Sequence, residues 1–311
     1  MNRPRFSFVM PAYKVMYLSK TIDSILNQDY SNYELIIVND ASPDNIKEIV
    51  NSYADDRIRY EENEHNIGGT DLVKNWNHCI TFANGDYIIL ATDDDIYEPE
   101  FLFNTVKLIK KYPHVDLIRS GVKKIDKDDN ILDFEFPMKE YMTNKEFTLY
   151  YAKGGIISCV SNYIIKKTAI EKIGGFISFP RAHYSDDATA LALSKNGIAC
   201  IPMNNFEFRV SNINLSNCNN LEIVIDQLKA TTKYMEWYLN YINKIDNTSD
   251  SFFERACYGG YKSRYIIMID NLLSKIAFSN LLFVIRFIFS NPYLFKKERY
   301  KVFFSYIISR L

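Results

Sequence analysis

The sequence predicts an α/β fold, in which a mostly parallel sheet is flanked by helices, followed by a helical C-terminal extension. Two patterns support this prediction. Between residues 6 and 120, short apolar runs alternate with stretches of helical periodicity, which is typical of βαβ units. Beyond Asn220 the pattern is helical and aromatic. We therefore expect an α/β domain over residues 1–215 and a helical region over residues 216–311.

The elements of the α/β domain can be assigned in order along the chain. Buried strands are expected at Phe6–Met10, Glu34–Val38 and Tyr87–Leu90, with a short strand at Ile58–Tyr60, and Pro11 is expected to stop the first of them. Apolar residues at helical spacing predict helices around residues 18–26, 46–53 and 72–83. Further along, strand-like runs at residues 162–165 and 206–210 enclose a helix at Ala188–Lys195.

The composition is that of a globular protein with a full core. Of the 311 residues, 47% are hydrophobic and 24% are charged, and 37 basic and 38 acidic residues leave a net charge of −1. This apolar fraction excludes intrinsic disorder. The near-neutral balance argues against a dedicated nucleic-acid-binding protein, because an excess of Lys and Arg is typical of that class. We expect no nucleic acid among the partners.

Acidic residues at the ends of predicted strands are the main chemical signal. In an open parallel sheet, ligands bind beyond the carboxyl ends of the strands, which selects the segments Pro11–Tyr13, Asn39–Ser42 and Thr92–Asp95. Three consecutive carboxylates, Asp93 to Asp95, repel one another unless a cation compensates them. Such oxygen ligands suit Mg²⁺ or Mn²⁺. The alternative interpretation of these three acids is a solvated acidic loop. For Asp40, the alternative interpretation is a helix cap.

In combination, these segments resemble the family-2 glycosyltransferases of the GT-A fold. The resemblance covers about residues 6–215 and rests on VMPAYK, ELIIVNDASPD, NEHNIGG and ATDDDIYEP, which occur in the family's order and spacing. It implies transfer of a sugar from a nucleotide-sugar to an acceptor, with inversion at the anomeric carbon. It also implies that residues 1–110 bind the nucleotide-sugar and that residues 111–215 bind the acceptor.

On this resemblance, the first half binds the nucleotide and a metal ion. The nucleotide-binding residues would be Pro11, Ala12, Tyr13, Asp40, Asn66, Gly68 and Asp93, with Arg209 near the diphosphate. Asp40 would accept a hydrogen bond from the base, usually uracil. Asp94 falls on the metal-ligating position of the family's DxD motif, with Asp95 beside it as a second ligand. The sequence departs from the motif at Thr92, where the first Asp normally stands.

The second half would supply the acceptor side and the catalytic base. Gly174-Gly175-Phe176 resembles the family's GGF loop, and Gly175, Phe176 and His183 are the acceptor candidates. An inverting transfer needs a carboxylate to take the proton from the attacking hydroxyl group. Asp186 matches the acid of the family's Glu-Asp motif, Asp187 is the alternative base, and Ser185 replaces the Glu. The competing interpretation of both acids is that they cap a helix. For Arg209, the competing interpretation is an ordinary position on the protein surface.

The resemblance therefore implies transfer from a UDP-sugar to a glycan or lipid-linked acceptor in surface polysaccharide synthesis, with Mg²⁺ or Mn²⁺ as cofactor. Two other functions stay open. An inactive nucleotide-sugar or polysaccharide-binding protein would lack the acids described above, and all are present. A sugar-1-phosphate nucleotidyltransferase would carry a glycine-rich basic loop after the first strand, where this chain has Pro11-Ala12-Tyr13-Lys14.

Location and partners are suggested by the two ends of the chain and by its cysteines. The N-terminal residues lack the apolar segment of a signal peptide, and the five cysteines never form a CxxC pair, so we expect a cytoplasmic protein. Near the C-terminus, the apolar run Leu281–Phe289 lies among basic residues, which fits a peripheral contact with the inner face of the cell membrane. Packing on the core, or a contact in a homodimer, is the alternative.

Overall fold

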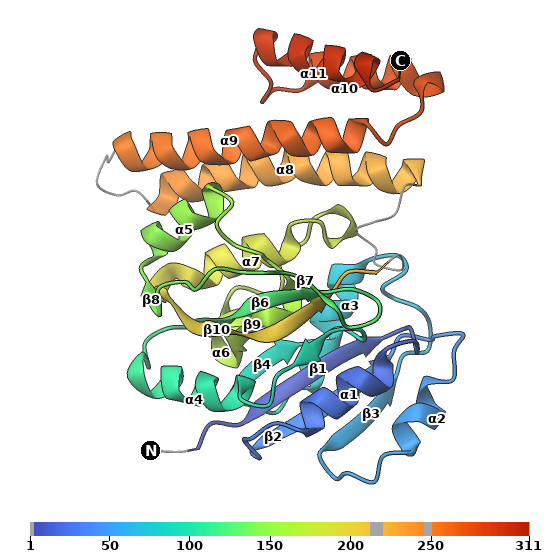
Figure 1. Ribbon diagram of the computed structural model, residues 1–311, viewed down its shortest axis with the longest axis vertical. Coiled ribbons are helices and arrows are strands. Elements are labelled where there is room, and N and C mark those ends of the chain that lie inside the picture. The colour runs from blue at the N-terminus through green and yellow to red at the C-terminus, as the bar shows by residue number, and fades with distance from the viewer. Residues whose placement is uncertain (1–2, 212–219, 246–250, 311) are drawn as a thin grey trace. The chain divides into compact units, whose positions relative to one another are not determined.

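The computed structural model of the chain describes residues 3–211, 220–245 and 251–310 (Figure 1). These residues form two compact units. The first comprises the residues up to 147 together with 157–178 and 185–211. The second comprises 148–156, 179–184 and the described residues from 220 onward, so two short segments of the predicted α/β domain group with the helical region. The predicted boundary between residues 215 and 216 lies outside the described residues.

A ten-stranded sheet forms the centre of the first unit. Its strands are β1 (Phe6–Ala12), β2 (Tyr33–Asn39), β3 (Ile58–Glu62), β4 (Tyr87–Leu90), β5 (Ile96–Tyr97), β6 (Leu117–Ile125), β7 (Ile131–Phe134), β8 (Tyr141–Met142), β9 (Tyr163–Lys166) and β10 (Ile198–Arg209). The order across the sheet is β3-β2-β1-β4-β9-β6-β10-β5, with β7 paired to β6 and β8 to β10. Strands β1 to β4 are parallel, whereas β9 is antiparallel to both of its neighbours. The predicted fold class is confirmed.

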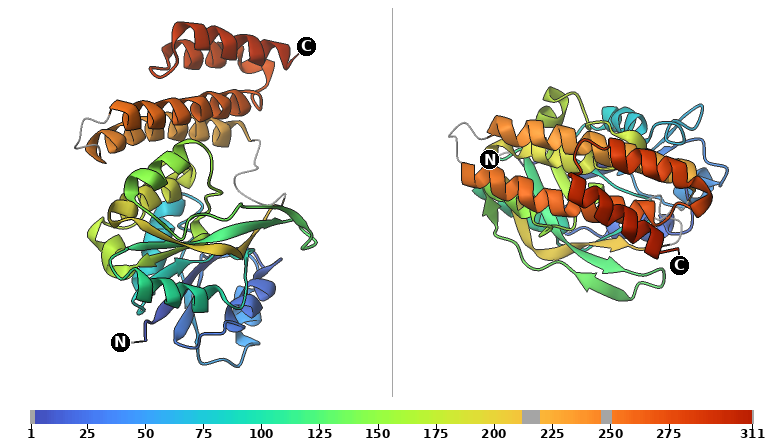
Figure 2. Two further views of the ribbon diagram at one scale, coloured as in Figure 1. Left: turned by 60° about the vertical axis from the view of Figure 1, so that its left-hand side comes forward. Right: turned by 90° about the horizontal axis from the view of Figure 1, so that it is seen from above.

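Helices flank this sheet (Figures 1 and 2). Along the chain they are α1 (Leu18–Leu26), α2 (Ile46–Asn51), α3 (Leu72–Cys79), α4 (Phe101–Lys111), α6 (Lys167–Lys172) and α7 (Ser185–Leu193). A further helix, α5 (Asn144–Ala152), begins in the first unit and ends in the second. The apolar faces of α1 and α4 enter one buried cluster with β1, in which Ile22, Phe101 and Phe8 are fully buried. Burial of these faces fixes the helices on the sheet and leaves the strand ends for other use.

Pro11 does not stop the first strand, which corrects the prediction made from its sequence. β1 continues to Ala12, paired with Asn39 of β2. Along a strand, the backbone N–H and C=O groups of successive residues point in turn to one neighbouring strand and to the other. The carbonyl oxygen of Ala12 points to the β2 side, because it accepts a hydrogen bond from the backbone N–H of Asp40. Pro11 therefore faces the β4 side, where pairing has already ended at Val9, and its missing N–H costs no ladder hydrogen bond.

The second unit is helical and has an aromatic core. Helices α8 (Leu221–Ile245) and α9 (Ser251–Leu273) lie side by side (Figure 2). Between them, the buried rings of Tyr234 and Tyr238 lie 5.4 and 4.6 Å from the ring of Tyr261, measured between centroids. The aromatic rings between α8 and α9 thus build part of the core of this unit.

Two shorter helices complete the second unit, α10 (Leu281–Ser290) and α11 (Lys296–Ile308). Among the described helices, none is alone both long enough and apolar enough to span a membrane. The segments Phe252–Leu273 and Phe278–Ser290 meet these requirements of length and composition only as a pair, and they are bent by 115° relative to each other.

Candidate active site

The carboxyl ends of β1, β2 and β4 meet at one edge of the sheet. The register pairs Ala12 with Asn39 across β1 and β2, and Val9 with Leu90 across β1 and β4. Because all three strands run in the same direction, the segments that follow them leave the sheet next to one another. Ala12 is buried and Pro11 is half-buried, so these two predicted residues are packed at the carboxyl ends of the strands.

The carboxylate of Asp93 ties two of these segments together. Its Oδ2 atom accepts hydrogen bonds from the backbone N–H groups of Tyr13, at 2.9 Å, and Lys14, at 2.8 Å. The hydroxyl group of Ser42 donates to the carbonyl oxygen of Tyr13 at 2.6 Å, which attaches the third segment. Tyr13 remains 40% exposed. The strand ends therefore share one hydrogen-bonded frame, on which Tyr13 is accessible to solvent.

Asp40 is buried, and its carboxylate holds the turn formed by Asn66 and Gly68. Oδ1 accepts hydrogen bonds from Asn63 Nδ2 at 2.7 Å and from the backbone N–H of Ile67 at 2.9 Å, and Oδ2 accepts one from the backbone N–H of Gly68 at 2.7 Å. A Cβ atom at Gly68 would lie 2.8 Å from the same Oδ2, so the close approach requires glycine. Three of the roughly four acceptor positions of a carboxylate are thus used by the protein.

The acids that follow β4 differ in their surroundings. Asp95 is buried, and its carboxylate accepts hydrogen bonds from the hydroxyl group of Thr92 and from the backbone N–H of Arg209, the latter at 2.9 Å. Asp94 is partly exposed, and burial, together with the negative charge of Asp93, raises its pKa to about 6. A nearby cation stabilises a carboxylate whose ionised form is disfavoured in this way. Asp94 is therefore the acid of this run best suited to a divalent ion.

The donor set around Asp94 fits Mg²⁺ or Mn²⁺ only with help from a substrate. Within the described ranges, no three Asp, Glu, His or Cys side chains are grouped so that they could hold a metal ion by themselves. Mg²⁺ is commonly bound by one or two carboxylates together with waters and substrate phosphates. A single partly exposed carboxylate at the strand edge meets that requirement, provided that the nucleotide supplies the remaining oxygen ligands.

Arg209 is completely buried beneath the acidic run, which excludes the surface position considered above. Its Nε atom donates to the carbonyl oxygen of Asp94 at 2.8 Å, and its Nη1 atom donates to the carbonyl oxygen of Asp126 at 3.0 Å and to Asp129 Oδ1 at 2.5 Å. The guanidinium group also lies 4.2 Å from the ring centroid of Tyr17. In this arrangement Arg209 positions the backbone that carries Asp94.

The loop with Gly175 and Phe176 is fastened to helix α3 by Asn77, a residue that the sequence did not single out. Asn77 Oδ1 accepts a hydrogen bond from the backbone N–H of Phe176 at 2.7 Å, and Nδ2 donates to its carbonyl oxygen at 3.2 Å. The ring of Phe176 meets Trp76 edge-on, with 5.5 Å between centroids. Gly174 and Gly175 have φ angles of +84° and +97°, and a Cβ atom at Gly175 would lie 2.4 Å from Asn77 Oδ1.

Asp186 and Asp187 occupy the first turn of α7. Burial raises the pKa of Asp186 to about 7, and the charge of Asp187 adds to this rise, whereas backbone N–H groups of the helix start oppose it. The hydroxyl group of Thr189 accepts from the backbone N–H of Ile177 at 2.9 Å and donates to the carbonyl oxygen of Ser185 at 2.6 Å. The start of α7 is therefore linked to the loop after Phe176, and Asp186 has a pKa suited to a general base near neutral pH.

His183, predicted on the acceptor side, belongs to the second compact unit. Its ring centroid lies 4.4 Å from that of Tyr184, and burial lowers the pKa of its imidazole to about 4. The imidazole is therefore neutral near pH 7, so it offers hydrogen bonding but no positive charge.

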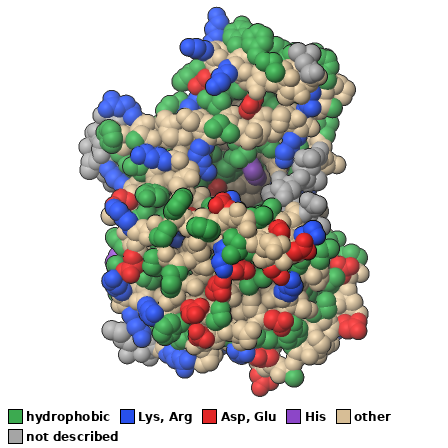
Figure 3. Space-filling model, in the orientation of Figure 1, with side chains coloured by type: hydrophobic (Ala, Val, Ile, Leu, Met, Phe, Trp, Pro, Cys, Tyr) green, Lys and Arg blue, Asp and Glu red, His purple; other side chains and the backbone are tan. Residues whose placement is uncertain are grey.

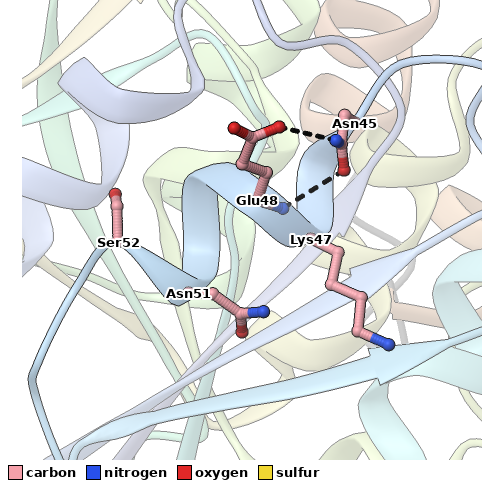
Figure 4. Close-up of a pocket in the computed structure, with 5 residues that line it drawn as sticks. All are labelled: Asn45, Lys47, Glu48, Asn51 and Ser52. Carbon is pink, nitrogen blue, oxygen red and sulfur yellow. Dashed lines mark hydrogen bonds between the residues drawn. The ribbon is translucent and has the colours of Figure 1, made fainter.

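A hollow over α2 is lined by Asn45, Lys47, Glu48, Asn51 and Ser52 (Figure 4). Asn45 caps α2, because its Oδ1 atom accepts from the backbone N–H of Glu48 at 3.3 Å while its Nδ2 atom donates to Glu48 Oε2 at 2.7 Å. These polar groups serve the helix end, and none of the predicted site residues lines the hollow. We assign it no ligand.

Comparison with known proteins gives consistent matches to one group of enzymes. Residues 7–174 match the family model described as "Glycosyl transferase family 2". The chain is 35% identical over 127 residues to the putative glycosyltransferase EpsE of Bacillus subtilis, a match that covers 40% of this chain and 45% of that protein. It is 38% identical over 104 residues to the putative colanic acid biosynthesis glycosyl transferase WcaA of Escherichia coli, covering 32% and 36%. These matches span less than half the length of either relative.

Solved structures share the fold at low sequence identity. S. aureus TarS 1–349 in complex with UDP-GlcNAc superposes with a TM-score of 0.65 at 15% identity, covering 98% of this chain and 91% of that one. The mannosyltransferase PcManGT from Pyrobaculum calidifontis, in complex with GDP-Man and Mn²⁺, gives a TM-score of 0.55 at 14% identity, covering 99% and 86%. At these identities the likeness establishes the fold alone.

Proposed function

Because this chain belongs to glycosyl transferase family 2, we propose that it transfers a sugar from a UDP-sugar to a hydroxyl group, with inversion at the anomeric carbon. The observation that supports this most directly is the frame at the strand ends, in which Asp93 binds the backbone of Tyr13 and Lys14 beside Asp94. A nucleotide lying across this frame would have an aromatic ring on one side and a carboxylate for its metal ion on the other.

In the proposed site, Asp94 would hold Mg²⁺ or Mn²⁺ together with the diphosphate of the donor. The cation, when bound, neutralises charge on the departing diphosphate. Asp95 is left out of the metal site, because its carboxylate already accepts hydrogen bonds from Thr92 and Arg209. Arg209, in turn, is proposed to act through the backbone of Asp94 and not by contact with the diphosphate.

The proposed base is Asp186, with Asp187 as the alternative. Its carboxylate takes the proton of the acceptor hydroxyl group while the hydroxyl oxygen attacks the anomeric carbon from the face opposite UDP. The bond between that carbon and the diphosphate oxygen breaks, UDP carries away the electron pair, and the proton stays on Asp186. A pKa near 7 keeps the carboxylate about half ionised at neutral pH, which a general base requires.

The nucleotide and the acceptor are proposed by analogy with named relatives. The TarS structure holds UDP-GlcNAc, which supports a UDP-sugar, whereas PcManGT holds GDP-Man, which makes a GDP-sugar the second candidate. The description of WcaA refers to colanic acid biosynthesis, which supports a glycan or lipid-linked acceptor in surface polysaccharide synthesis. We propose a cytoplasmic site of action for this step.

Release of the nucleoside diphosphate tests this function. The full chain would be incubated with UDP-GlcNAc, UDP-glucose, UDP-galactose and GDP-mannose, each with Mn²⁺ and with EDTA. We expect UDP release from a UDP-sugar that depends on Mn²⁺. Release of GDP alone would move the donor to the other nucleotide class. Tight binding of UDP without release from any donor would favour the nucleotide-sugar-binding alternative.

A further inference from the structure

Positive charge is concentrated in the last part of the chain. Residues 251–311 contain ten Lys and Arg and three Asp and Glu, a net charge of +7, whereas residues 1–250 carry a net charge of −8. Between residues 275 and 310 the only acidic residue in the sequence is Glu298, and Lys262 binds it at 3.0 Å. The basic residues of α10 and α11 therefore lie in a segment with almost no acid to neutralise them.

The same two helices expose apolar side chains. Eight of the ten residues of α10 are apolar, the other two being Arg286 and Ser290, yet only Val284 and Ile288 are buried. Leu282 of α10 is 74% exposed, and Phe304 and Ile308 of α11 are 58% and 68% exposed. Solvent exposure of large apolar side chains in a group marks a surface that another apolar phase covers.

The exposed apolar and basic residues form one surface. On α10, exposed positions follow helical spacing, and so do those on α11, with the ring of Phe289 lying 5.7 Å from the ring of Tyr300 and joining the two sets. We define the α10–α11 surface by its exposed residues: Leu282, Arg286, Phe289, Lys297, Tyr300, Lys301, Phe304 and Ile308. Figure 3 shows green apolar side chains interspersed with blue basic ones on these helices.

From this combination, we propose that the α10–α11 surface binds the anionic face of a lipid bilayer, with the two helices lying in the plane of the interface. Anionic headgroups would neutralise Lys297 and Lys301, and the apolar side chains would enter the boundary of the acyl chains. α10 has ten residues and is therefore about 15 Å long, half of the roughly 30 Å needed to cross the hydrocarbon core.

Charge decides against a second copy of this chain as the partner. In a two-fold dimer the same surface occurs on both subunits, so the lysines of one copy would face the basic residues of the other. Like charges brought together in this way oppose association. An anionic membrane supplies opposite charge and an apolar phase together, which a second copy does not.

Cosedimentation of the full chain with vesicles tests the proposal. Vesicles of phosphatidylcholine alone would be compared with vesicles containing phosphatidylglycerol as well. We expect binding to the anionic vesicles that weakens as salt is added. Because each basic residue near such a surface contributes about 1 kcal/mol, Lys297→Gln combined with Lys301→Gln should weaken partitioning roughly 30-fold.

Matched variants distinguish binding through this surface from nonspecific adsorption to vesicles. Leu282→Asn combined with Phe304→Asn removes exposed apolar side chains and should abolish most of the binding without unfolding the unit. The control for these is Phe136→Asn, at a phenylalanine of the first unit that is 84% exposed, and the control for charge is Lys110→Gln combined with Lys195→Gln. Both controls should bind as the wild type does.

Three outcomes would overturn the proposal. The wild type does not bind anionic vesicles, the surface variants bind them as tightly as the wild type does, or the control variants lose as much vesicle binding as the surface variants do. A dimer in sedimentation velocity that the same surface variants dissociate would instead assign the surface to a second copy. Vesicle binding does not depend on sugar transfer, so failure of the proposed function leaves this result unaffected.

Discussion

The side-chain amide of Asn77 forms two hydrogen bonds with the backbone of Phe176, 99 residues away in the chain. The amide accepts from the N–H group at 2.7 Å and donates to the carbonyl group at 3.2 Å, as a neighbouring strand would. This pairing fixes the loop that the family resemblance assigns to the acceptor. It also explains why the residue before Phe176 is a glycine, since a side chain there would collide with the same amide.

The two adjacent glycines of this loop should therefore differ in their tolerance of alanine. Both have positive φ, but a Cβ atom at Gly174 meets no atom within 4 Å, whereas one at Gly175 lies 2.4 Å from Asn77 Oδ1. Gly174→Ala should cost only the backbone strain of about 1–2 kcal/mol. Gly175→Ala should cost about 2 kcal/mol more, because two hydrogen bonds of about 1 kcal/mol each are displaced. Midpoints of urea denaturation would measure the difference.

A double variant provides the control for this prediction. In an Asn77→Ala background the obstructing amide is gone, so Gly174→Ala and Gly175→Ala should become nearly equivalent. Equal losses of stability already in the wild-type background would show that the contact with Asn77 contributes little.

Asp94→Asn should abolish the Mn²⁺-dependent part of UDP binding without lowering the free energy of unfolding, because burial and the charge of Asp93 already disfavour the ionised carboxylate in the folded protein. The amide keeps the size of the side chain but is a poor ligand for a hard cation. Calorimetric titration of UDP with Mn²⁺ and with EDTA would measure this. Asp56→Asn, at an exposed position of the first unit, is the matched control. If Asp94→Asn binds UDP and Mn²⁺ as the wild type does, the metal assignment is wrong.

The pKa of Asp186 predicts opposite effects of pH on activity and on stability. Turnover should rise about tenfold per pH unit below pH 7 and level off above it, because only the ionised carboxylate accepts the proton. Asp186→Asn should lower turnover by about 10²–10⁴-fold while leaving UDP binding intact.

For stability, the folded state raises the pKa of Asp186 from its ordinary value near 4, so the ionised form is disfavoured in the folded protein. The resulting loss of stability is absent below about pH 4, grows between pH 4 and 7, and is complete above pH 7. Asp186→Asn should therefore raise the Tm at pH 8 more than at pH 4. Asp187→Asn serves as the comparison. If it proves the inactive variant and Asp186→Asn the mild one, the base is the neighbouring residue.

Arg209→Lys should distinguish a positioning role from direct contact with the diphosphate. Lysine keeps the positive charge but cannot bond Asp94, Asp126 and Asp129 together, so the variant should lose about 2 kcal/mol of stability along with metal-dependent UDP binding. Chemical denaturation and UDP titration would be measured on the same preparation. Unchanged stability with a selective fall in turnover would return Arg209 to the diphosphate.

The strands β1, β2 and β4 could be predicted from the sequence because they are almost entirely buried on both faces. The run Tyr87–Leu90 was assigned with the bounds it has in the structure, since turn residues flank four apolar ones. Of β10, the run at residues 206–210 predicts only the last third, because Pro202 to Asn205 interrupt the apolar pattern. At that place the pairing with β6 shifts register between Ile201 and Phe206, which no periodicity in one strand can reveal.

The site could be predicted only as far as its motifs extend. The segments with Tyr13, Asp40 and Asp93 are recognisable in sequence because each follows a strand end. The contacts of Asn77 and the burial of Arg209 are not, because they depend on partners about 80 to 115 residues away. A polar residue on an amphipathic helix has the same local pattern whether it faces solvent or a distant loop.

The contact between Trp76 and Phe176 gives the loop an optical reporter. The chain has two tryptophans, Trp76 in the first compact unit and Trp237 in the second. In a Trp237→Phe variant, all tryptophan emission would come from the ring packed on Phe176. In a Trp76→Phe variant, it would come from helix α8. Fluorescence can thus follow the unfolding of each unit separately and show whether an acceptor quenches or shifts the emission of the loop without any added label.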